Sequence, residues 1–444
     1  MSGRSAFILV AGALGCLVTV FCIGVLAFTF LTLYNTQIAS LEPINRIAFL
    51  DNDNNIHVVD SRGERAVVLT SDANDRRIYT FPTFSPNSQR VAFMGISGTP
   101  AQREGSLYTV PISGGTPKVV YSSASQFPFY LYWAPDNQRV GFLAQSENEL
   151  SLLLGDADGK EIARKVETGS PMYWSWAPDS RALLLHIGGS RRDSPRARLA
   201  LVPGENNVEP KNLAQSPAAF LAPQYSPDGS AILYAASDSS ESDGLFVADA
   251  QGAGARLIAN YRGRIAFEWS PDGKKIAWMT TPPTTRLPNL GKIESSARDG
   301  SEKISLIDED ALAFFWSPDS ARIIYLTLVR PGGTQGCAPE CARGVGLAAP
   351  RAQDALRLRW QIVTLADKQI KTVVSFQPTT EFLSVLPYFD QYARSLTFWS
   401  PNSDEIVYTQ SEGEDKGSVW VIGVNGDAKP RRIADGLFAV WSWK

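Results

Sequence analysis

The side chains suited to acid–base chemistry are few in this chain and stand apart from one another. Of its 444 residues only two are histidines, His57 and His186, and both lie in apolar runs typical of strands, NIHVV and LLLHIG. Catalysis needs titratable groups that are tuned and placed together. No G-x-S-x-G nucleophile motif appears either. We therefore expect no catalytic residue, no cofactor and no metal site, and a protein that is not an enzyme.

Carboxylates occur in two patterns that resemble sites. Asp51–Asn55, with the sequence DNDNN, has alternating oxygens that suit Ca²⁺. It also joins two predicted strands, so an Asx-rich hairpin turn is the simpler interpretation. The second pattern is a series of aspartates that each follow a proline: Asp136, Asp179, Asp228, Asp272 and Asp319. A turn explains that context, so we do not interpret them as paired catalytic carboxylates.

The proline–aspartate context belongs to a repeated unit. One copy is FEWSPDGKKIAW at residues 267–278, in which an aromatic residue and Ser lead into Pro, Asp and Gly before an apolar run. Pro suits the second position of a type I turn, and Asp and Gly suit the positions after it. Seven copies occur, with their prolines at 86, 135, 178, 227, 271, 318 and 401. The steps are 43 to 49 residues and one of 83, and such a period indicates a repeat architecture.

Each repeat predicts four antiparallel strands, because a second hairpin follows the proline turn. Four-stranded units arranged in a circle give an all-β propeller, in which each blade buries its faces against its neighbours. Residues 44–70 resemble a repeat without its first strand, and Leu437–Lys444 resemble that strand alone. Joined, they make a blade that closes the ring through both ends of the domain. We predict about eight blades over residues 44–444, with seven as the alternative and an inserted loop at 330–357.

These turns carry a family resemblance. The aromatic-Ser-Pro-Asp-Gly turn followed by an apolar strand resembles the WD40-like PD40 repeat of TolB-type β-propellers, over about Ile44 to the C-terminus. The resemblance implies a propeller fold. It leaves function open, because such blades occur in partner-binding propellers and in enzymes.

The N-terminal segment predicts a membrane anchor. Residues 6–34 contain no charge, and about 20 apolar residues suffice for a helix to cross a bilayer. A cleaved signal peptide is the alternative, although its apolar core is normally about 7 to 15 residues. If residues 6–34 form an uncleaved anchor, residues 1–5 are a short cytoplasmic N-terminus and residues 35–43 are a linker. Arg4 precedes the span and Arg46 is the first basic residue after it, which favours a propeller on the extracytoplasmic, periplasmic or extracellular side.

Cysteine usage agrees with an oxidising compartment. Cys16 and Cys22 lie in the apolar segment, whereas Cys337 and Cys341 stand close together in GCAPECAR and could form a small disulfide. A nucleic-acid partner is not expected, because the net charge is −3 and no basic block stands out.

Two connections between predicted blades are unusually aromatic and make the best candidates for binding. They supply Phe127, Phe129 and Tyr130 from QFPFYLYW, and Tyr388, Phe389 and Tyr392 from LPYFDQY. Aromatic residues are enriched at protein interfaces, although these rings could instead fill the centre of the ring. We expect a single-pass membrane protein that binds a protein partner, for example as an accessory subunit of a cell-envelope or membrane complex. The alternative is a surface sensor or enzyme that binds a small ligand, such as a sugar, in the central channel.

Overall fold

The computed structural model describes residues 44–204, 209–219, 221–237, 243–284, 290–329 and 356–444. The chain divides into two compact units, 1–44 and 45–444, and the description below concerns the second. The predicted membrane span at 6–34, most of the inserted loop at 330–357, and Cys337 and Cys341 lie outside the described residues. None of the helices within those described ranges combines the length and apolarity needed to span a bilayer.

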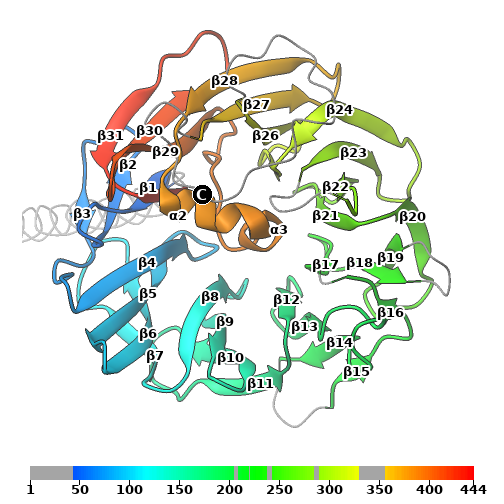
Figure 1. Cartoon of the computed structure of the whole chain (residues 1–444), viewed down its shortest axis with the longest axis horizontal. Helices are drawn as coiled ribbons and strands as arrows, with labels where there is room; N and C mark the ends of the chain where they lie inside the picture. Colours follow the sequence, from blue (N-terminus) through cyan, green and yellow to red (C-terminus); the bar gives the residue numbers. More distant parts are fainter. Residues whose placement is uncertain (1–43, 205–208, 220, 238–242, 285–289, 330–355) are drawn as a thin grey trace, which may run out of the picture. The chain divides into compact units, whose positions relative to one another are not determined.

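Residues 45–444 form eight antiparallel sheets that follow one another around a ring (Figure 1). From the innermost strand outward, the first four sheets are as follows. Blade 1 contains β32 (Phe438–Trp441), β1 (Arg46–Leu50), β2 (Ile56–Asp60) and β3 (Val67–Val68); blade 2 contains β4 (Arg77–Phe84), β5 (Arg90–Thr99), β6 (Gln102–Pro111) and β7 (Lys118–Ser123). Blade 3 contains β8 (Phe127–Trp133), β9 (Arg139–Gln145), β10 (Leu150–Asp156) and β11 (Arg164–Thr168); blade 4 contains β12 (Met172–Trp176), β13 (Ala182–Ile187), β14 (Arg198–Pro203) and β15 (Lys211–Asn212).

The other four sheets repeat this order with two irregularities. Blade 5 contains β16 (Ser216–Pro217) and β17 (Gln224–Tyr225), which both pair with β18 (Ala231–Ser237), then β19 (Asp243–Asp249) and β20 (Arg256–Tyr261); blade 6 contains β21 (Arg264–Trp269), β22 (Lys275–Thr281), β23 (Gly291–Ala297) and β24 (Ile304–Ala311). Blade 7 contains β25 (Ala313–Trp316), β26 (Arg322–Leu328), β27 (Leu358–Thr364) and β28 (Ile370–Phe376). Blade 8 contains β29 (Glu405–Gly413), β30 (Lys416–Gly423) and β31 (Arg431–Asp435). Its innermost strand is reduced to a single bridge from Trp399 to Ile406 of β29, and Thr397 beside it bridges to Trp441 of blade 1.

The eight-bladed prediction is therefore confirmed, and so is the closure of the ring. β32 pairs with β1 over Ile47–Leu50, so the C-terminal strand is the innermost strand of the first blade. The backbone N–H of Asn45 also donates to the carbonyl of Lys444 at 2.8 Å. This pairing hides the strand edges that an open ring would expose.

All seven proline turns adopt the expected conformation. In each, the fourth residue donates its backbone N–H to the carbonyl of the first at 2.7 to 3.1 Å, as in a type I turn. That fourth residue has a φ of 60° to 70°, a region that Gly and Asn tolerate best. It is Ser88, Asn137, Ser180, Gly229, Gly273, Ser320 or Ser403.

The turns lie on one side of the ring, which we call the Pro-turn face. Because strand direction alternates within a blade, the connections between blades and the loops between second and third strands lie on the opposite side, the loop face. The first described residues of the propeller meet the Pro-turn face, since Lys444, which bonds Asn45, also donates its N–H to the Ser88 hydroxyl at 3.0 Å.

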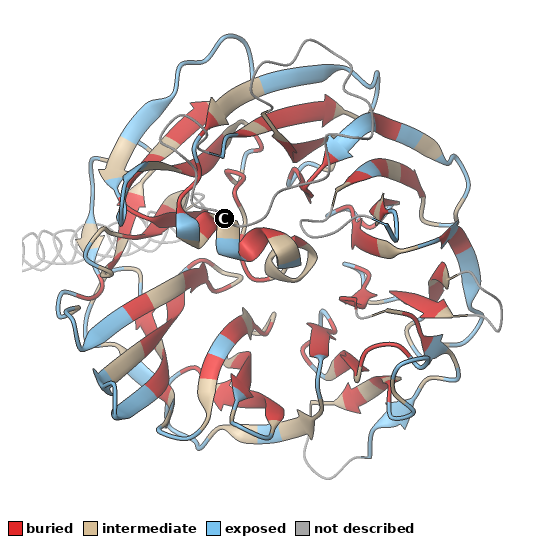
Figure 2. Cartoon of the chain, in the orientation of Figure 1, coloured by how far each residue is buried: buried red, intermediate tan, exposed pale blue. Residues whose placement is uncertain are grey.

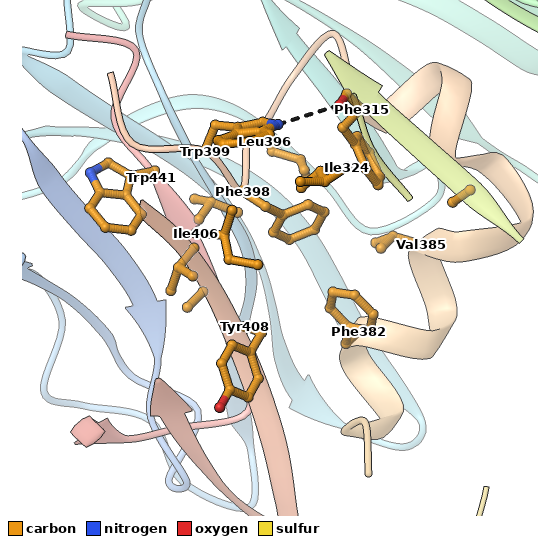
Figure 3. Close-up of a cluster of buried hydrophobic side chains, with 14 of the residues drawn as sticks. Phe315, Ile324, Phe382, Val385, Leu396, Phe398, Trp399, Ile406, Tyr408 and Trp441 are labelled. Atoms are coloured by element: carbon orange, nitrogen blue, oxygen red, sulfur yellow. Dashed lines mark hydrogen bonds between the residues drawn. The ribbon is translucent and has the colours of Figure 1, made fainter. Parts of the chain in front are cut away.

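The motif aromatic residues hold neighbouring blades together. Trp133, Trp176 and Trp399 are buried, and each donates its indole N–H to a backbone carbonyl of the preceding blade, at 3.2 to 3.4 Å. Figure 3 shows this for Trp399 and the Phe315 carbonyl, among the apolar side chains between blades 7 and 8. The core is therefore distributed between the blades, as the buried positions along the strands in Figure 2 also show.

The connection between blades 7 and 8 contains helices, where the sequence predicted a loop. Residues 377–396, here called the central plug, include α2 (Thr380–Val385), a 3-10 turn (Leu386–Tyr388) and α3 (Phe389–Tyr392). The Thr379 hydroxyl caps α2 by accepting from the N–H of Phe382. In Figure 1, α2 and α3 lie across the middle of the ring. Such short helices leave too little periodicity to be recognised from sequence.

Candidate functional site at the centre of the ring

The predicted aromatic binding residues divide into an inner and an outer group. Tyr130 and Phe389 are buried, at 3% and 1% exposed, and Tyr392 is half-buried. The rings of Tyr130 and Tyr392 meet edge to face at 5.2 Å between centroids, and Phe389 packs against Phe315 of blade 7. These three rings fill the centre of the ring, which is the alternative that the sequence left open for them.

Hydroxyl groups fix the plug to blades 3 and 4. The hydroxyls of Tyr130 and Tyr173 lie 2.7 Å apart, and both donate to the backbone carbonyl of Gln391, at 2.8 and 2.7 Å. Burial raises the pKa of both tyrosines well above the ordinary value, so both stay neutral donors. Further along the plug, the Thr83 hydroxyl of blade 2 donates to the Ser395 carbonyl.

The outer group remains open to solvent. Phe129 is 43% exposed and Tyr388 is 53% exposed, whereas Phe127 is half-buried. Phe129 lies at a β-bulge, because the register of β8 against β9 shifts between Pro128 and Tyr130. A bulged residue is released from the ladder and its side chain is re-aimed. The sequence placed Phe127, Phe129 and Tyr130 in a connection between blades, whereas all three lie in the first residues of β8, at its loop-face end. Tyr388 belongs to the connection between blades 7 and 8.

A group of charged side chains that the sequence analysis did not identify lies in β21 and the central plug. Glu268, the penultimate residue of β21, is 6% exposed, and its Oε1 has no hydrogen-bond partner among the residues that the structure describes. Burial raises its pKa to about 8, although the charge of Arg394 opposes that shift. Asp390 of the plug is close enough to raise that pKa further.

The two plug residues face the same region. Burial raises the pKa of Asp390 to about 6, while the backbone N–H of Gln391 and the charge of Arg394 act against the shift. Arg394 also acts electrostatically on the phenols of Tyr132 and Tyr173. Its guanidinium forms no ion pair or hydrogen bond with any residue in the described part of the chain. Because α3 packs against β21, two carboxyls and a guanidinium therefore lie within electrostatic reach of one another.

Comparison of the blades gives the signal by which Glu268 could have been found. It occupies the position just before the motif aromatic residue, where the other blades have Thr83, Tyr132, Ser175, Gln224, Phe315, Phe398 and Val440. Glu268 is the one charged residue in that series. Asp390 and Arg394 had no comparable signal, because they lie outside the repeat.

The histidines and the acidic turn have structural roles. His186 is buried and its ring nitrogens contact the carbonyls of Leu221 and Gly189 at 2.9 and 2.8 Å. His57 contacts Asp51 at 2.7 Å. The Asp51 side chain accepts from the N–H groups of Asp53 and Asn55, which is the Asx-type hairpin turn that the sequence favoured. Among the described residues, no group of three or more His, Cys, Asp or Glu could hold a metal ion.

A cavity of about 420 Å³ lies at the junction of blades 1 and 2. Its lining includes Asp72, Arg77 and Tyr79. The Asp72 carboxylate is occupied by the Arg77 guanidinium and accepts from the Tyr79 hydroxyl at 2.7 Å. Because these polar groups satisfy one another, this cavity is a weaker candidate than the centre of the ring.

The fold defines an eight-bladed β-propeller, and comparison with solved structures gives neighbours of that class. They include an oligogalacturonate lyase from Vibrio parahaemolyticus (16% identity over 87% of this chain and 99% of that chain, TM-score 0.50). They also include a prolyl endopeptidase (13% identity, 83% of this chain, TM-score 0.51), of which the chain spans half the length.

TolB proteins, whose repeats the sequence resembles, are also among the structural neighbours. The putative TolB from Agrobacterium tumefaciens shares 17% identity over 60% of this chain and 89% of its own, with a TM-score of 0.40. At these identities the likeness establishes the propeller fold alone. The sequence matches no protein-family model and no curated protein.

Proposed function

We propose that this protein is a membrane-anchored, extracytoplasmic β-propeller that binds another protein through its loop face and catalyses no reaction. The observation that carries the proposal is the exposure of Phe129, near the start of β8, and of Tyr388, in the connection between blades 7 and 8, at 43% and 53%. Aromatic rings that stand free of the core are the usual anchors of protein interfaces.

The rigidity of the surrounding backbone supports this role. Phe129 precedes Tyr130, and Tyr388 precedes Phe389, and both of these neighbours are buried in contacts with the plug or its surroundings. Exposed rings on a fixed backbone lose little conformational freedom when they bind, so more of their contact energy contributes to affinity.

The membrane anchor rests on the sequence. The uncharged residues 6–34 are long enough to span a bilayer, and Arg4 before them favours a cytoplasmic N-terminus. The propeller begins at Asn45, on the Pro-turn face.

Site-specific cross-linking in native membranes tests the proposal. A photoreactive phenylalanine analogue placed at 388 should capture one protein reproducibly, and mass spectrometry should identify it. The same analogue at 274, where Lys274 is exposed on the Pro-turn face, is the matched control and should not capture that protein.

A further variant separates specific from adventitious capture. Phe129→Ser in the chain that carries the analogue at 388 should reduce the yield of the cross-link severalfold, because it removes one of two anchors. Equal capture from 274 and 388, or capture unaffected by Phe129→Ser, would contradict docking on the loop face.

A further inference from the structure

The centre of the ring contains a charged group that no other part of the fold explains. An ionisable carboxyl such as Glu268, buried with an unpartnered oxygen, is unfavourable compared with an apolar residue or a paired one. Seven other blades place uncharged residues at the equivalent position, so the propeller does not require a charge there. Glu268 therefore calls for a partner from outside the described structure.

The backbone that carries Glu268 is held firmly in place. The buried side chain of Gln224, from the neighbouring blade, donates to the Phe267 carbonyl at 2.5 Å and accepts from the N–H of Trp269 at 3.2 Å. These two bonds fix the backbone on both sides of Glu268. A carboxyl that is positioned in this way is pre-organised for binding.

Arg394 is positioned by a similar arrangement. Three residues before it, the Gln391 carbonyl accepts from two tyrosine hydroxyls, and immediately after it the Ser395 carbonyl accepts from Thr83. The plug backbone is thus anchored on both sides of Arg394. The guanidinium, half-buried and without an ion pair to any described residue, remains available to a ligand.

The chemistry of these groups identifies the kind of ligand. A guanidinium binds a carboxylate through two parallel hydrogen bonds. Glu268 keeps its proton at neutral pH and so is a second donor to an anion. Asp390 is largely ionised there, and it can accept from a hydroxyl or amino group on the same ligand. A molecule with both features satisfies all three side chains.

We infer that the centre of the ring is a binding site for a small organic carboxylate that also carries a hydrogen-bond donor. Arg394 is its counter-ion, Glu268 donates to the carboxylate and Asp390 accepts from the ligand's donor. The charge of Arg394 also acts on the phenols of Tyr132 and Tyr173. This site is separate from the exposed rings of the loop face and does not depend on a protein partner.

The test uses the full chain in detergent micelles with glycolate as the probe and propionate as its control. Propionate has the same size and carboxylate but lacks the hydroxyl. Ligand-detected NMR at pH 6.5 should show saturable binding of glycolate, severalfold tighter than binding of propionate. No saturable glycolate binding, or equal binding of the two, would overturn the inference.

Variants locate the binding. Arg394→Gln should weaken glycolate binding about tenfold or more, because a charged hydrogen-bond pair is lost. The matched control is Arg181→Gln, an exposed arginine near the turn of blade 4, and it should leave binding unchanged. An equal loss in both variants would overturn the site.

The role of Glu268 is tested through the pH dependence of glycolate binding, because Glu268 can donate to the carboxylate only while it keeps its proton. Glycolate binding to the unsubstituted chain should weaken as the pH rises from 6.5 to 9.5, because Glu268 loses its proton in this range. The charges of Asp390 and Arg394 act on that proton in opposite directions. Glu268→Gln keeps a donor that does not titrate, so it should bind at pH 6.5 and lose most of this pH dependence. A variant that folds, as judged by its circular dichroism, yet retains the full pH dependence would contradict the role of Glu268.

Discussion

The backbone N–H of Asp319 in blade 7 donates to the hydroxyl of Ser403 in blade 8, at 3.0 Å. Ser403 is the turn residue with positive φ, so one residue both completes its own turn and joins its blade to the preceding one. The same bond occurs from Asn87 to Asn137, from Asp136 to Ser180 and from Asp272 to Ser320, at 2.7 to 3.0 Å. Gly229 and Gly273 cannot form it, because they have no side chain.

We predict that Ser403→Ala lowers the stability of the propeller by about 1 to 2 kcal/mol, because the N–H of Asp319 loses its acceptor. The measurement is the melting temperature followed by circular dichroism. Ser403→Asn is the matched control and should cost much less, because Asn137 fills the equivalent role in blade 3. A larger loss for Ser403→Asn than for Ser403→Ala would refute this function of the turn residue.

The propeller fold could be predicted from the sequence because the motif that indicates it is repeated. Each proline turn fixes two strands, and the seven copies confirm one another. The composite blade followed from the incomplete repeats at the two ends of the domain, and the pairing of Leu50 with Phe438 bears it out.

The centre of the ring was less predictable for a physical reason. The plug occurs once, so no second copy marks its helices, and its position depends on contacts such as Tyr130 to Gln391, which are 261 residues apart. The sequence identified the aromatic residues but could not tell which of them would be buried. It could not show that Glu268 and Arg394 approach each other, because closing the ring brings them together.

Tyr130 and Tyr173 donate to the same carbonyl, that of Gln391, so we predict that their contributions to stability are coupled. Tyr130→Phe or Tyr173→Phe alone leaves the Gln391 carbonyl bonded to the other hydroxyl, so each should cost only about 0.5 to 1 kcal/mol. The double variant leaves that carbonyl with only the more distant N–H of Arg394, at 3.2 Å, and should cost about 0.5 to 1 kcal/mol more than the sum. A double-mutant cycle by chemical denaturation measures this excess, and strict additivity would contradict the shared role.

The exposed rings predict a loss of partner binding without a loss of stability. Phe129→Ser and Tyr388→Ser together should abolish co-purification of the protein captured at 388, yet leave the melting temperature within about 1 °C, since neither ring is part of the core. Ile162→Ser is the control, because Ile162 is an apolar residue that is even more exposed, at 97%, but lies outside the loop face, between β10 and β11. Loss of the partner in the control as well would indicate a general apolar effect instead of a site.

Glu268 predicts how the stability of the propeller depends on pH. Its pKa is raised from the ordinary value of 4.5 to about 8 in the folded protein, mainly by burial. Between these values the folded chain holds a proton that the unfolded chain has lost, so the free energy of unfolding falls as the pH rises from about 4.5 to about 8. The shift corresponds to at most about 4 to 5 kcal/mol.

Glu268→Gln should remove the contribution of residue 268 to the pH dependence of stability, because the glutamine amide does not titrate. The variant should match the natural chain at pH 4, where Glu268 is protonated in both states, and exceed it in stability by several kcal/mol at pH 9. Urea denaturation at the two values of pH measures the difference. Asp390→Asn is the comparison, since a pKa of about 6 confines its effect to a lower range of pH. An equal stability gain of Glu268→Gln at pH 4 and pH 9 would show that packing, and not the buried charge, is the cause.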